Sequence, residues 1–566
     1  MATSNKYDRQ LRLWGASGQK ALAETSVILV NPSSSGTESL KNLVLPGLGH
    51  FLIVDTLEHT AVDEVDISSN FFVSQRSDKS KSRAQVTCEL LQELNPDVQG
   101  SFVIVDTKTS FSSEAWKSDI LSQIPSRIQH VVVLASDLNP NLTISLSHVC
   151  VQHMHSLIAV QSYGLIGTVR VQYATPWIPI AEPKPRDTPP DLRLSHPFPD
   201  FVEYADSLDM KSMDLHTHKH VPYPVILYKI AQQYKQQNNN QLPKEFAEKQ
   251  AFAQMIKDHA MDYNEELNYH EATRNAYLAY ATPSNATNKW TRLLQTIEQQ
   301  TNNHHASLSS FVALVRALHT FAQRHGGQIP LTGTIPDMTA STLLYVQLQT
   351  LYHQQAAKDV NELQKILQEQ QASESNSSVT LEQIQSACQT ASHWDLLVNR
   401  TIFEEYSPGS PPETVVTELQ SAWEEVVEES GYNEAAPSPE LTPLLWYGAL
   451  SACGQFETEH GRYPGTVAKG NVDDPNDPWK QDIPAVTQYL MAWLQKYGLS
   501  TVSKEQIQNI ATEVTRYGDS EIHNVAAVVG GVASQEVVKL ITGQYTPIHN
   551  TYVYNGIASI GGVYEF

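Results

Sequence analysis

The chain has 566 residues and a formal net charge of −23, with 38 Lys and Arg residues against 61 Asp and Glu residues. Because the basic residues form no dense stripe, this balance argues against a nucleic-acid partner. The length is enough for about three or four domains. Since no apolar run approaches about 18 residues, we expect no membrane span and a soluble, intracellular protein.

The cysteine pattern argues against a structural zinc site. No two cysteines form a Cys-x-x-Cys pair, and none shares a metal-ligand spacing with a histidine. The four are Cys88, Cys150, Cys388 and Cys453. We expect no metal in this chain and a reducing compartment, with a cytoplasmic and nuclear location.

Short apolar segments alternate with helical patterns as far as about residue 175. This alternation predicts an α/β fold with a mostly parallel, doubly wound sheet. The predicted strands are 27–30, 51–54, 102–105, 131–134, 157–160 and 167–173.

The loop Asn31–Gly36 lies where a strand turns into a helix, at residues 37–45, and this is the usual place of a nucleotide-binding loop. Glycines let backbone N–H groups approach a phosphate there, but only Gly36 keeps that pattern. Asp55 ends the next strand, close to the roughly 20-residue spacing of a ribose-binding acid. A nucleotide site and a plain βαβ unit with a strand-end turn residue fit this pattern equally well.

The middle of the chain has a different composition. Residues 176–199 are rich in proline and predict a connector. Residues 220–370 are rich in helix formers, with apolar positions at helical spacing, and predict a helical insertion. Two further segments, 370–378 and 407–414, predict exposed or partly disordered loops.

The chain closes with a predicted apolar helix at 524–541 and a strand at 550–554. Gly530 and Gly531 each cost about 1 kcal/mol relative to alanine inside a helix, so we expect another element to approach closely there. The return of a helix and a strand predicts one discontinuous domain interrupted by another. The predicted domains are 1–175 with 510–566, and a mainly helical insertion at 176–509.

Three motifs carry a resemblance to a known family. They are Tyr7–Gly15, Leu40–Leu43 and Val529–Lys539, and they resemble the ubiquitin-like-protein activating enzymes. This family implies a ThiF/MoeB-like Rossmann fold. Gly333–Met338, Gly461–Gly465 and the chain length resemble the regulatory, non-catalytic subunits of the neddylation branch.

The resemblance implies that the nucleotide loop is degenerate. The four family glycines would fall on Asn31, Ser33, Ser34 and Gly36, so three are replaced. A Cβ atom at Ser33 and Ser34 narrows the space for a triphosphate, although the serine hydroxyls could still contact an anion. We therefore predict no cofactor-binding residues in this chain, and expect ATP and magnesium in a partner subunit.

Other family positions for phosphate and metal contacts also differ. The Asn, Arg and Gln of active members correspond to Ser68, Ser69 and Asn70, the following lysine to Arg83, and a second acidic residue to Leu57. The insertion resembles the family's catalytic-cysteine half-domain, yet none of the four cysteines lies in a segment like the thioester motif. The resemblance thus implies that the nucleophile belongs to the partner.

Two acidic family positions survive. Asp55 matches the ribose-binding acid as a vestige, and Asp137 matches a magnesium-binding acid. Each also has a structural explanation, and Asp137 precedes Leu138-Asn139-Pro140, which favours a turn residue.

Arg9 is the candidate functional residue. A helix over Tyr7–Trp14 places Tyr7, Leu11 and Trp14 on one face and Arg9 on nearly the opposite side. In the family, the arginine at this position is supplied in trans to the ATP of the active partner, where it stabilises developing charge. The alternative is a solvated helix charge.

The resemblance implies a regulatory subunit of a heterodimeric activating enzyme that is not active alone. The expected partners are the catalytic subunit, the ubiquitin-like modifier and its conjugating enzyme. Three alternatives remain: the corresponding sumoylation subunit, a stand-alone adenylating enzyme with an unusual loop, and an interaction protein without catalytic consequence.

Overall fold

The computed structural model describes residues 6–57, 61–62, 64–73, 81–175, 177–180, 191–280, 286–300, 309–371, 379–407, 409–432, 438–466, 477–499 and 501–566. The chain forms two compact units. Unit 1 comprises residues 1–178 and 397–566, and unit 2 comprises residues 179–396. The predicted loop at 370–378 and the connector at 176–199 lie partly outside the described residues.

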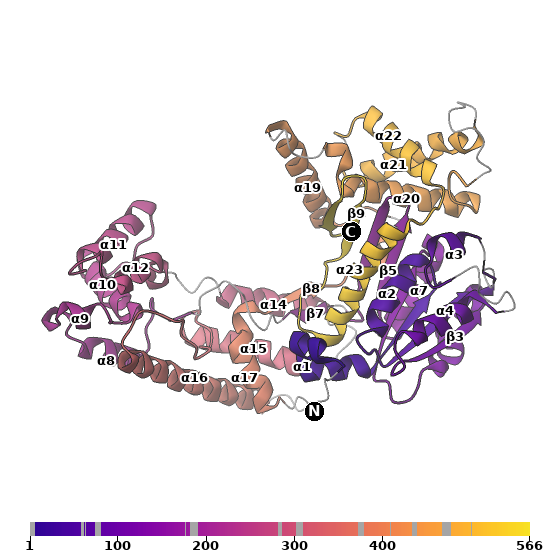
Figure 1. The fold of residues 1–566 in the computed structure, drawn as a ribbon. Helices are drawn as coiled ribbons and strands as arrows, with labels where there is room; N and C mark the ends of the chain where they lie inside the picture. The colour runs from indigo at the N-terminus through magenta and orange to yellow at the C-terminus, as the bar shows by residue number, and fades with distance from the viewer. Residues whose placement is uncertain are drawn as a thin grey trace. The chain divides into compact units, whose positions relative to one another are not determined.

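Unit 1 is built on an eight-stranded sheet of order β10-β9-β6-β5-β4-β1-β2-β3 (Figure 1). The five strands from β3 to β5 are parallel, and β6, β9 and β10 continue the sheet in antiparallel pairs. The bounds are β1 Thr25–Val30, β2 His50–Thr56, β3 Gln99–Val105, β4 His130–Ser136, β5 Ser156–Tyr163, β6 Ile166–Gln172, β9 Thr551–Asn555 and β10 Ile560–Tyr564. The predicted α/β fold with a helical region between its strands is confirmed.

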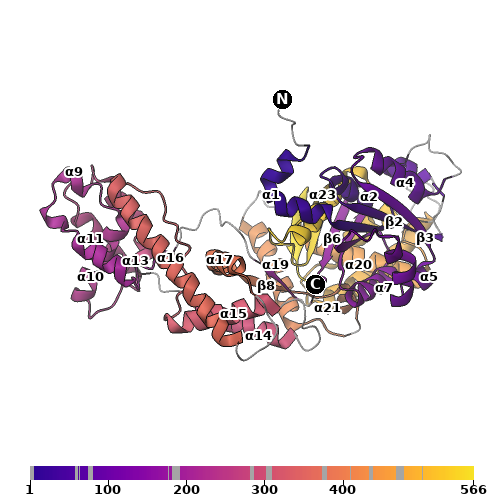
Figure 2. The ribbon, with the colours of Figure 1, turned by 90° about the horizontal axis from the view of Figure 1, so that it is seen from below.

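Helices cover both faces of this sheet (Figure 2). In β1, Val27 and Leu29 pack toward one helical layer, while Ile28 and Val30 pack toward the other. Both faces are buried, which explains why the parallel strands are continuous apolar runs. The first layer holds α1 Asp8–Ala23, α2 Ser34–Val44, α4 Arg83–Glu93 and α23 His523–Thr542, and the second holds α5 Thr107–Ser110, α6 Ser113–Ala115, η2 Trp116–Ile120 and α7 Pro140–Gln152.

The strand register places the candidate loop at a switch in strand order. Val30 pairs with Val54 on one side and with Ala135 on the other, so β1, β2 and β4 end at the same edge. Strand order reverses between β1 and β4, the place where ligands bind in open α/β sheets. The short α3, Glu64–Ser69, follows β2 at this edge.

The C-terminal boundary of unit 2 is residue 396, whereas the predicted insertion extends over 176–509. Residues 397–509 fall in unit 1, where they share a core with Tyr163, Ile166 and Phe566. The prediction was wrong because the periodicity of an amphipathic helix does not show on which unit of the chain it packs. The helices are α18 Ile402–Tyr406, α19 Glu413–Tyr432, α20 Pro443–His460, α21 Ile483–Lys496 and α22 Lys504–Tyr517.

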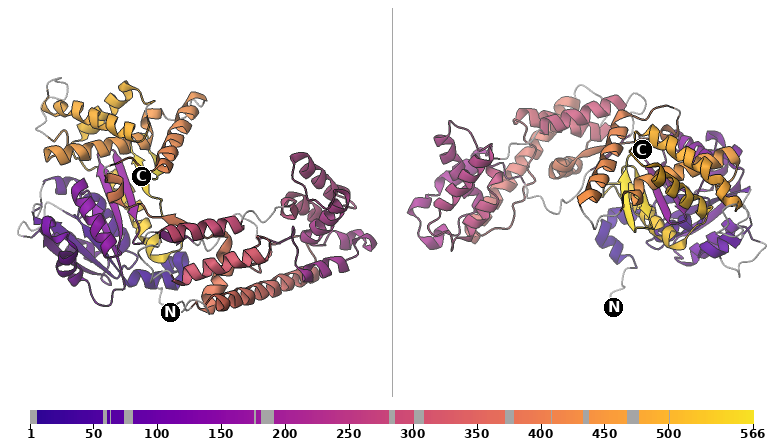
Figure 3. Two further views of the ribbon diagram at one scale, coloured as in Figure 1. Left: turned by 180° about the vertical axis from the view of Figure 1, so that it is seen from behind. Right: turned by 90° about the horizontal axis from the view of Figure 1, so that it is seen from above.

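Unit 2 is mainly helical, as the composition of residues 220–370 predicts. Its helices are α8 Pro199–Ser207, α9 Leu215–His218, α10 Tyr223–Gln237, α11 Phe246–Asp258, α12 Leu267–Arg274, α13 Tyr277–Tyr280, α14 Ala286–Gln300, α15 Ser309–Arg324, α16 Thr342–Gln371 and α17 Leu381–Thr390. The long α16 stands out in Figure 3. Phe201, Tyr228 and Tyr352 contribute to an aromatic core, and β7 Trp177–Ile180 pairs with β8 Asp395–Val398 where the chain passes between the units.

Within the described part of the chain, α23 is the only helix long and apolar enough to cross a membrane by length and composition. One of its sides packs on the sheet through Val529, Ala533 and Val537. It also buries the carboxyl group of Glu536, which accepts a hydrogen bond from the backbone of Ile548. These contacts are those of a core helix in a globular domain.

Candidate functional site

The loop after β1 keeps a glycine-like backbone without its glycine. Asn31 has φ 64°, in the left-handed region that asparagine tolerates better than most residues. Its side-chain Nδ2 donates to the Ser136 carbonyl at 2.8 Å, which ties β1 to the end of β4. The asparagine thus preserves the tight turn that a glycine would otherwise make.

The serine side chains of the loop form hydrogen bonds within the protein itself. The hydroxyls of Ser33 and Ser35 donate to Asp137 Oδ2 at 2.6 Å and 2.7 Å. Asp137 Oδ1 accepts a hydrogen bond from the backbone N–H of Ser162 at 2.8 Å. Both oxygens of Asp137 are therefore engaged, and Ser33 also caps the N-terminus of α2.

Glu521 lies at the N-terminus of α2, where a phosphate would bind. Its carboxyl oxygens accept the backbone N–H of Ser34 at 3.0 Å and, more weakly, that of Ser35 at 3.5 Å. The first N–H groups of a helix have no intrahelical acceptor, and the helix dipole favours a negative group beside them. Glu521 supplies the acceptor that an anion supplies in a nucleotide site.

Carboxyl groups gather behind this contact. Burial, followed by the charge of Asp137, holds the pKa of Glu521 well above its usual range, and the two carboxyls share a hydrogen bond. Burial also raises the pKa of Glu457 and of Asp519 to about 7. A polyphosphate at the N-terminus of α2 would meet this set of acidic groups.

Arg83 pairs with Asp55, the residue at the position of the family's ribose-binding acid. Its Nη2 donates to Asp55 Oδ1 at 2.7 Å and to Asn31 Oδ1 at 2.6 Å, and its Nε donates to Asp55 Oδ2 at 3.2 Å. Burial alone would lower the pKa of Arg83, but Asp55 and Asp66 more than offset it, so the pKa is raised. Asp55 is fully buried in this pair and would have to leave it to meet a ribose.

The segment Ser68–Asn70 packs against the same loop. The Ser34 hydroxyl donates to the Ser69 carbonyl at 2.8 Å. Asn70 Nδ2 donates to the Pro32 carbonyl at 3.2 Å, and its Oδ1 accepts from the Thr37 hydroxyl at 3.1 Å. These residues brace the loop, while Leu57 lies exposed beyond the end of β2.

Arg9 lies on α1, which Figure 1 shows at the end of the sheet away from α3. Lys6 and Tyr7, which lead into α1, donate to Asp97 at 2.8 Å and 3.0 Å, and the Tyr7 ring faces Gly47. Asp97 and Gly47 precede the amino ends of β3 and β2, and a strand of seven residues spans about 20 Å. The exposed Arg9 side chain therefore cannot reach the loop of its own subunit.

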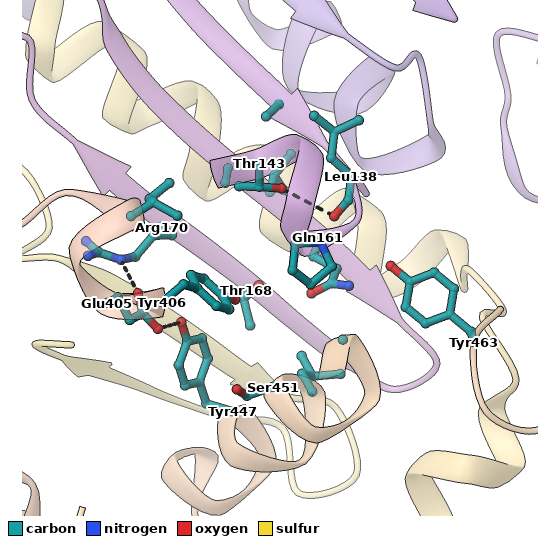
Figure 4. Close-up of a pocket in the computed structure, with 17 residues that line it drawn as sticks. Leu138, Thr143, Gln161, Thr168, Arg170, Glu405, Tyr406, Tyr447, Ser451 and Tyr463 are labelled. Carbon is teal, nitrogen blue, oxygen red and sulfur yellow. Dashed lines mark hydrogen bonds and ion pairs between the residues drawn. The ribbon is translucent and has the colours of Figure 1, made fainter. Parts of the chain in front are cut away.

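A small cavity lies on the second face of the sheet, between β5, β6, α18 and α20 (Figure 4). Its volume is about 70 Å³. Arg170 Nε donates to the Glu405 carboxylate at 3.1 Å, and the Tyr447 hydroxyl donates to the other oxygen of the same carboxylate. That volume suits a few water molecules and is too small for a nucleotide. A neighbouring groove of about 350 Å³ has the cation Lys496, which donates to the Glu405 carbonyl at 3.2 Å.

The sequence matches the model of the ThiF family over residues 7–561. It is 33% identical over 577 aligned residues to the NEDD8-activating enzyme E1 regulatory subunit of Gallus gallus, covering 99% of this chain and 98% of that protein. It is also 33% identical to the NEDD8-activating enzyme E1 regulatory subunit AXL of Arabidopsis thaliana, covering 98% and 97%. The chain belongs to the ThiF family, among the NEDD8-activating enzyme E1 regulatory subunits.

This membership confirms the predicted resemblance, and it favours the neddylation branch over the sumoylation alternative. Among solved structures, the crystal structure of E. coli MccB has a TM-score of 0.25 and 16% identity, over 30% of this chain and 45% of that chain.

Sequence reasoning identified the loop of this ThiF chain, Asp55, Asp137 and Arg83, which the fold brings to one edge of the sheet. It missed Glu521. The available signal was an acidic residue just before the glycine-containing helix, but nothing in the sequence showed that this helix begins beside α2.

Proposed function

We propose that this chain is the non-catalytic half of a heterodimeric activating enzyme for a ubiquitin-like modifier of the neddylation pathway. It binds a catalytic subunit, which holds ATP and magnesium, adenylates the modifier and carries the thioester cysteine. The four cysteines described in this chain are buried, and burial raises the pKa of Cys88 to about 11 and of Cys453 to about 12, opposite to a thiolate nucleophile. The proposed location is the cytoplasm and nucleus.

The observation that carries the proposal is the set of internal hydrogen bonds at the loop Asn31–Gly36 and at Asp55, Asp137, Arg83 and Glu521, which together we call the pseudo-site. Glu521 contacts the N–H groups of Ser34 and Ser35, and Arg83 holds Asp55. A nucleotide at this edge would have to displace both a carboxyl group and a buried ion pair. The residues present do not fit ATP, so no reaction step is assigned to this loop.

Arg9 is the residue proposed to act in the partner's site. It is exposed on α1, and none of the hydrogen bonds or ion pairs identified among the described residues involves it. Arg12, three residues on, pairs with Asp8 at 2.9 Å. A guanidinium held on a packed helix can stabilise charge that develops as pyrophosphate leaves the modifier adenylate.

The test is modifier-dependent ATP–pyrophosphate exchange by the chain alone, by the catalytic subunit alone and by the reconstituted complex. We expect exchange at full rate only in the complex. Exchange by this chain alone would support the stand-alone enzyme and refute the proposal.

Arg9→Ala should lower the rate of adenylate formation by about 100-fold, the typical effect of removing one transition-state donor. Arg12→Ala is the matched control, since it removes an equal charge from the same helix, and it should change the rate less than twofold. Equal effects of the two substitutions, or normal adenylation by Arg9→Ala in an intact complex, would exclude the role of Arg9.

A further inference from the structure

The helix that carries Arg9 is interrupted at Gly15. The φ of 71° and ψ of −179° at this residue lie outside the helical region, in a conformation that is essentially restricted to glycine. α1 therefore consists of two helical segments, residues 8–14 and 16–23, and Arg9 lies on the first, which we call the front segment. Because the helical backbone is broken between them, other contacts must fix the orientation of the front segment.

The front segment has few contacts with the core. None of residues 8–14 is buried, whereas Gly18 and Leu22 of the second segment are buried. Trp14, the last residue of the front segment, packs at the edge of the core that contains Leu22, and its carbonyl accepts a hydrogen bond from Gln544 at 2.7 Å. These contacts anchor the rear end of the front segment. The position of Arg9 therefore depends on what holds the other end.

The loop that precedes β3 holds this other end. Lys6 Nζ and the Tyr7 hydroxyl donate to the same oxygen, Asp97 Oδ2, at 2.8 Å and 3.0 Å. Asn95 Nδ2 donates to the Tyr7 hydroxyl at 3.1 Å and to the Val44 carbonyl of α2 at 2.9 Å. The start of α1 is thus bonded to a loop that is itself fixed on the end of α2.

Asp97 is the acceptor at which these contacts converge. Hydrogen bonds from Lys6 and then from Tyr7 lower the pKa of its carboxyl group, as expected for a carboxylate that accepts two donors. The Tyr7 ring also lies against Gly47, where an added Cβ atom would be only 2.8 Å from the ring. The Tyr7 carbonyl accepts the N–H of Leu11 at 2.9 Å, so the position of Tyr7 sets that of the first turn of the front segment.

We propose that Asp97 is a positioning residue for Arg9, because it fixes the start of the front segment and thereby the direction in which the arginine leaves α1. This inference rests on the proposed function, in which Arg9 acts at the partner's ATP. Misplacement of a group that stabilises developing charge by about 1 Å can lower a rate by about 100-fold. Because exposed ion pairs contribute little to stability, loss of Asp97 should alter this placement without unfolding unit 1.

The experiment measures modifier-dependent ATP–pyrophosphate exchange by the complex reconstituted with Asp97→Ala and with the wild-type chain. Glu93→Ala is the matched control, since it removes an exposed carboxylate four residues earlier, at the end of α4. Each substitution is also combined with Arg9→Ala. Circular dichroism and gel filtration establish that each variant is folded and assembled.

Asp97→Ala should lower kcat at least about fivefold and change the KM for the modifier less than about twofold, since the arginine acts on the ATP. In the Arg9→Ala background the same substitution should have no further effect, because Asp97 then has no arginine to position. Glu93→Ala should change the rate less than about twofold in both backgrounds. An unchanged rate for Asp97→Ala, or an equal loss with and without Arg9, would overturn the inference.

Hydrogen exchange of the chain tests the positioning directly. In Asp97→Ala the amides of residues 11–14 should exchange at least about threefold faster, while those of the second segment should be unchanged. Unchanged exchange in the front segment would overturn the inference. A slow Arg9→Ala complex with a normal Asp97→Ala complex rejects the inference alone, whereas normal adenylation by an intact Arg9→Ala complex rejects the proposed role of Arg9 and the inference with it.

Discussion

The two adjacent glycines of α23 should respond to alanine in opposite directions. A Cβ atom on Gly530 would lie 2.9 Å from Glu38 Cβ and 3.0 Å from both the Ser35 carbonyl oxygen and the Ser39 nitrogen of α2. A Cβ atom on Gly531 would meet no atom within 4 Å outside the neighbouring helix backbone. The expected close approach is therefore confirmed for Gly530 and wrong for Gly531.

The magnitudes follow from these contacts. Alanine gains about 1 kcal/mol over glycine inside a helix, and this gain applies at both positions. At Gly530 the obstacles include two backbone atoms of α2, so overpacking of about 1–3 kcal/mol opposes the gain. Gly531→Ala should thus stabilise α23 by about 1 kcal/mol, while Gly530→Ala should be neutral or destabilise it by up to about 2 kcal/mol.

Hydrogen exchange of the α23 amides in the isolated chain gives the free energy of local opening for each variant. This measurement reports on α23 itself and does not require the two units to unfold together. A difference of about 1–3 kcal/mol between the variants is expected from the two terms above. Equal shifts of the same sign would refute the close packing of α2 on Gly530.

Three further predictions concern the pseudo-site. Arg83→Met leaves Asp55 as an unpaired buried carboxylate and should destabilise unit 1 by about 3–5 kcal/mol in urea unfolding, whereas an unchanged midpoint would contradict the ion pair. Glu457 has a folded pKa of about 7, above its unfolded value, so the folded state holds a proton that the unfolded state releases and stability falls as pH rises from about 4.5 to 7. Thermal midpoints across this window should fall less steeply with pH in Glu457→Gln than in the wild-type chain, and parallel curves for the two proteins would exclude this titration. Replacing Ser33 and Ser34 by glycine should not create ATP binding in calorimetry, because Glu521 and Arg83 remain in place; measurable binding would show that the lost glycines alone close the loop.

Much of the sheet could be predicted because its strands are buried on both faces. Continuous apolar runs such as Val27–Val30 and Phe51–Val54 are visible without knowledge of their neighbours. β10 was missed because Gly561 and Gly562 lie at its centre, and glycine carries little strand signal. It forms because β9 offers an unpaired edge, with Gly562 opposite Val553, and that edge exists only in the folded sheet.

The candidate site was predictable in position but not in its contacts. The loop position follows from the strand–turn–helix pattern at residues 27–45. The contact between Glu521 and Ser34 joins residues 487 positions apart, and no local pattern reports such a distance. The pairing of Arg83 with Asp55 likewise depends on α4 lying beside β2, which periodicity does not fix.

The pseudo-site has internal hydrogen bonds at the positions where a nucleotide site contacts its ligand. The N-terminus of α2 presents backbone N–H groups whether or not a nucleotide binds, and buried N–H groups without acceptors are costly. Glu521 accepts these N–H groups from within the chain, and Asp137 accepts the hydroxyls of Ser33, which stands at a glycine position, and of Ser35. Because α2 is satisfied internally, it keeps its place against the sheet without a ligand, and α23 keeps its place against α2. α1 packs on α23, so the loop, which does not fit ATP, still helps to fix the position of the helix that carries Arg9.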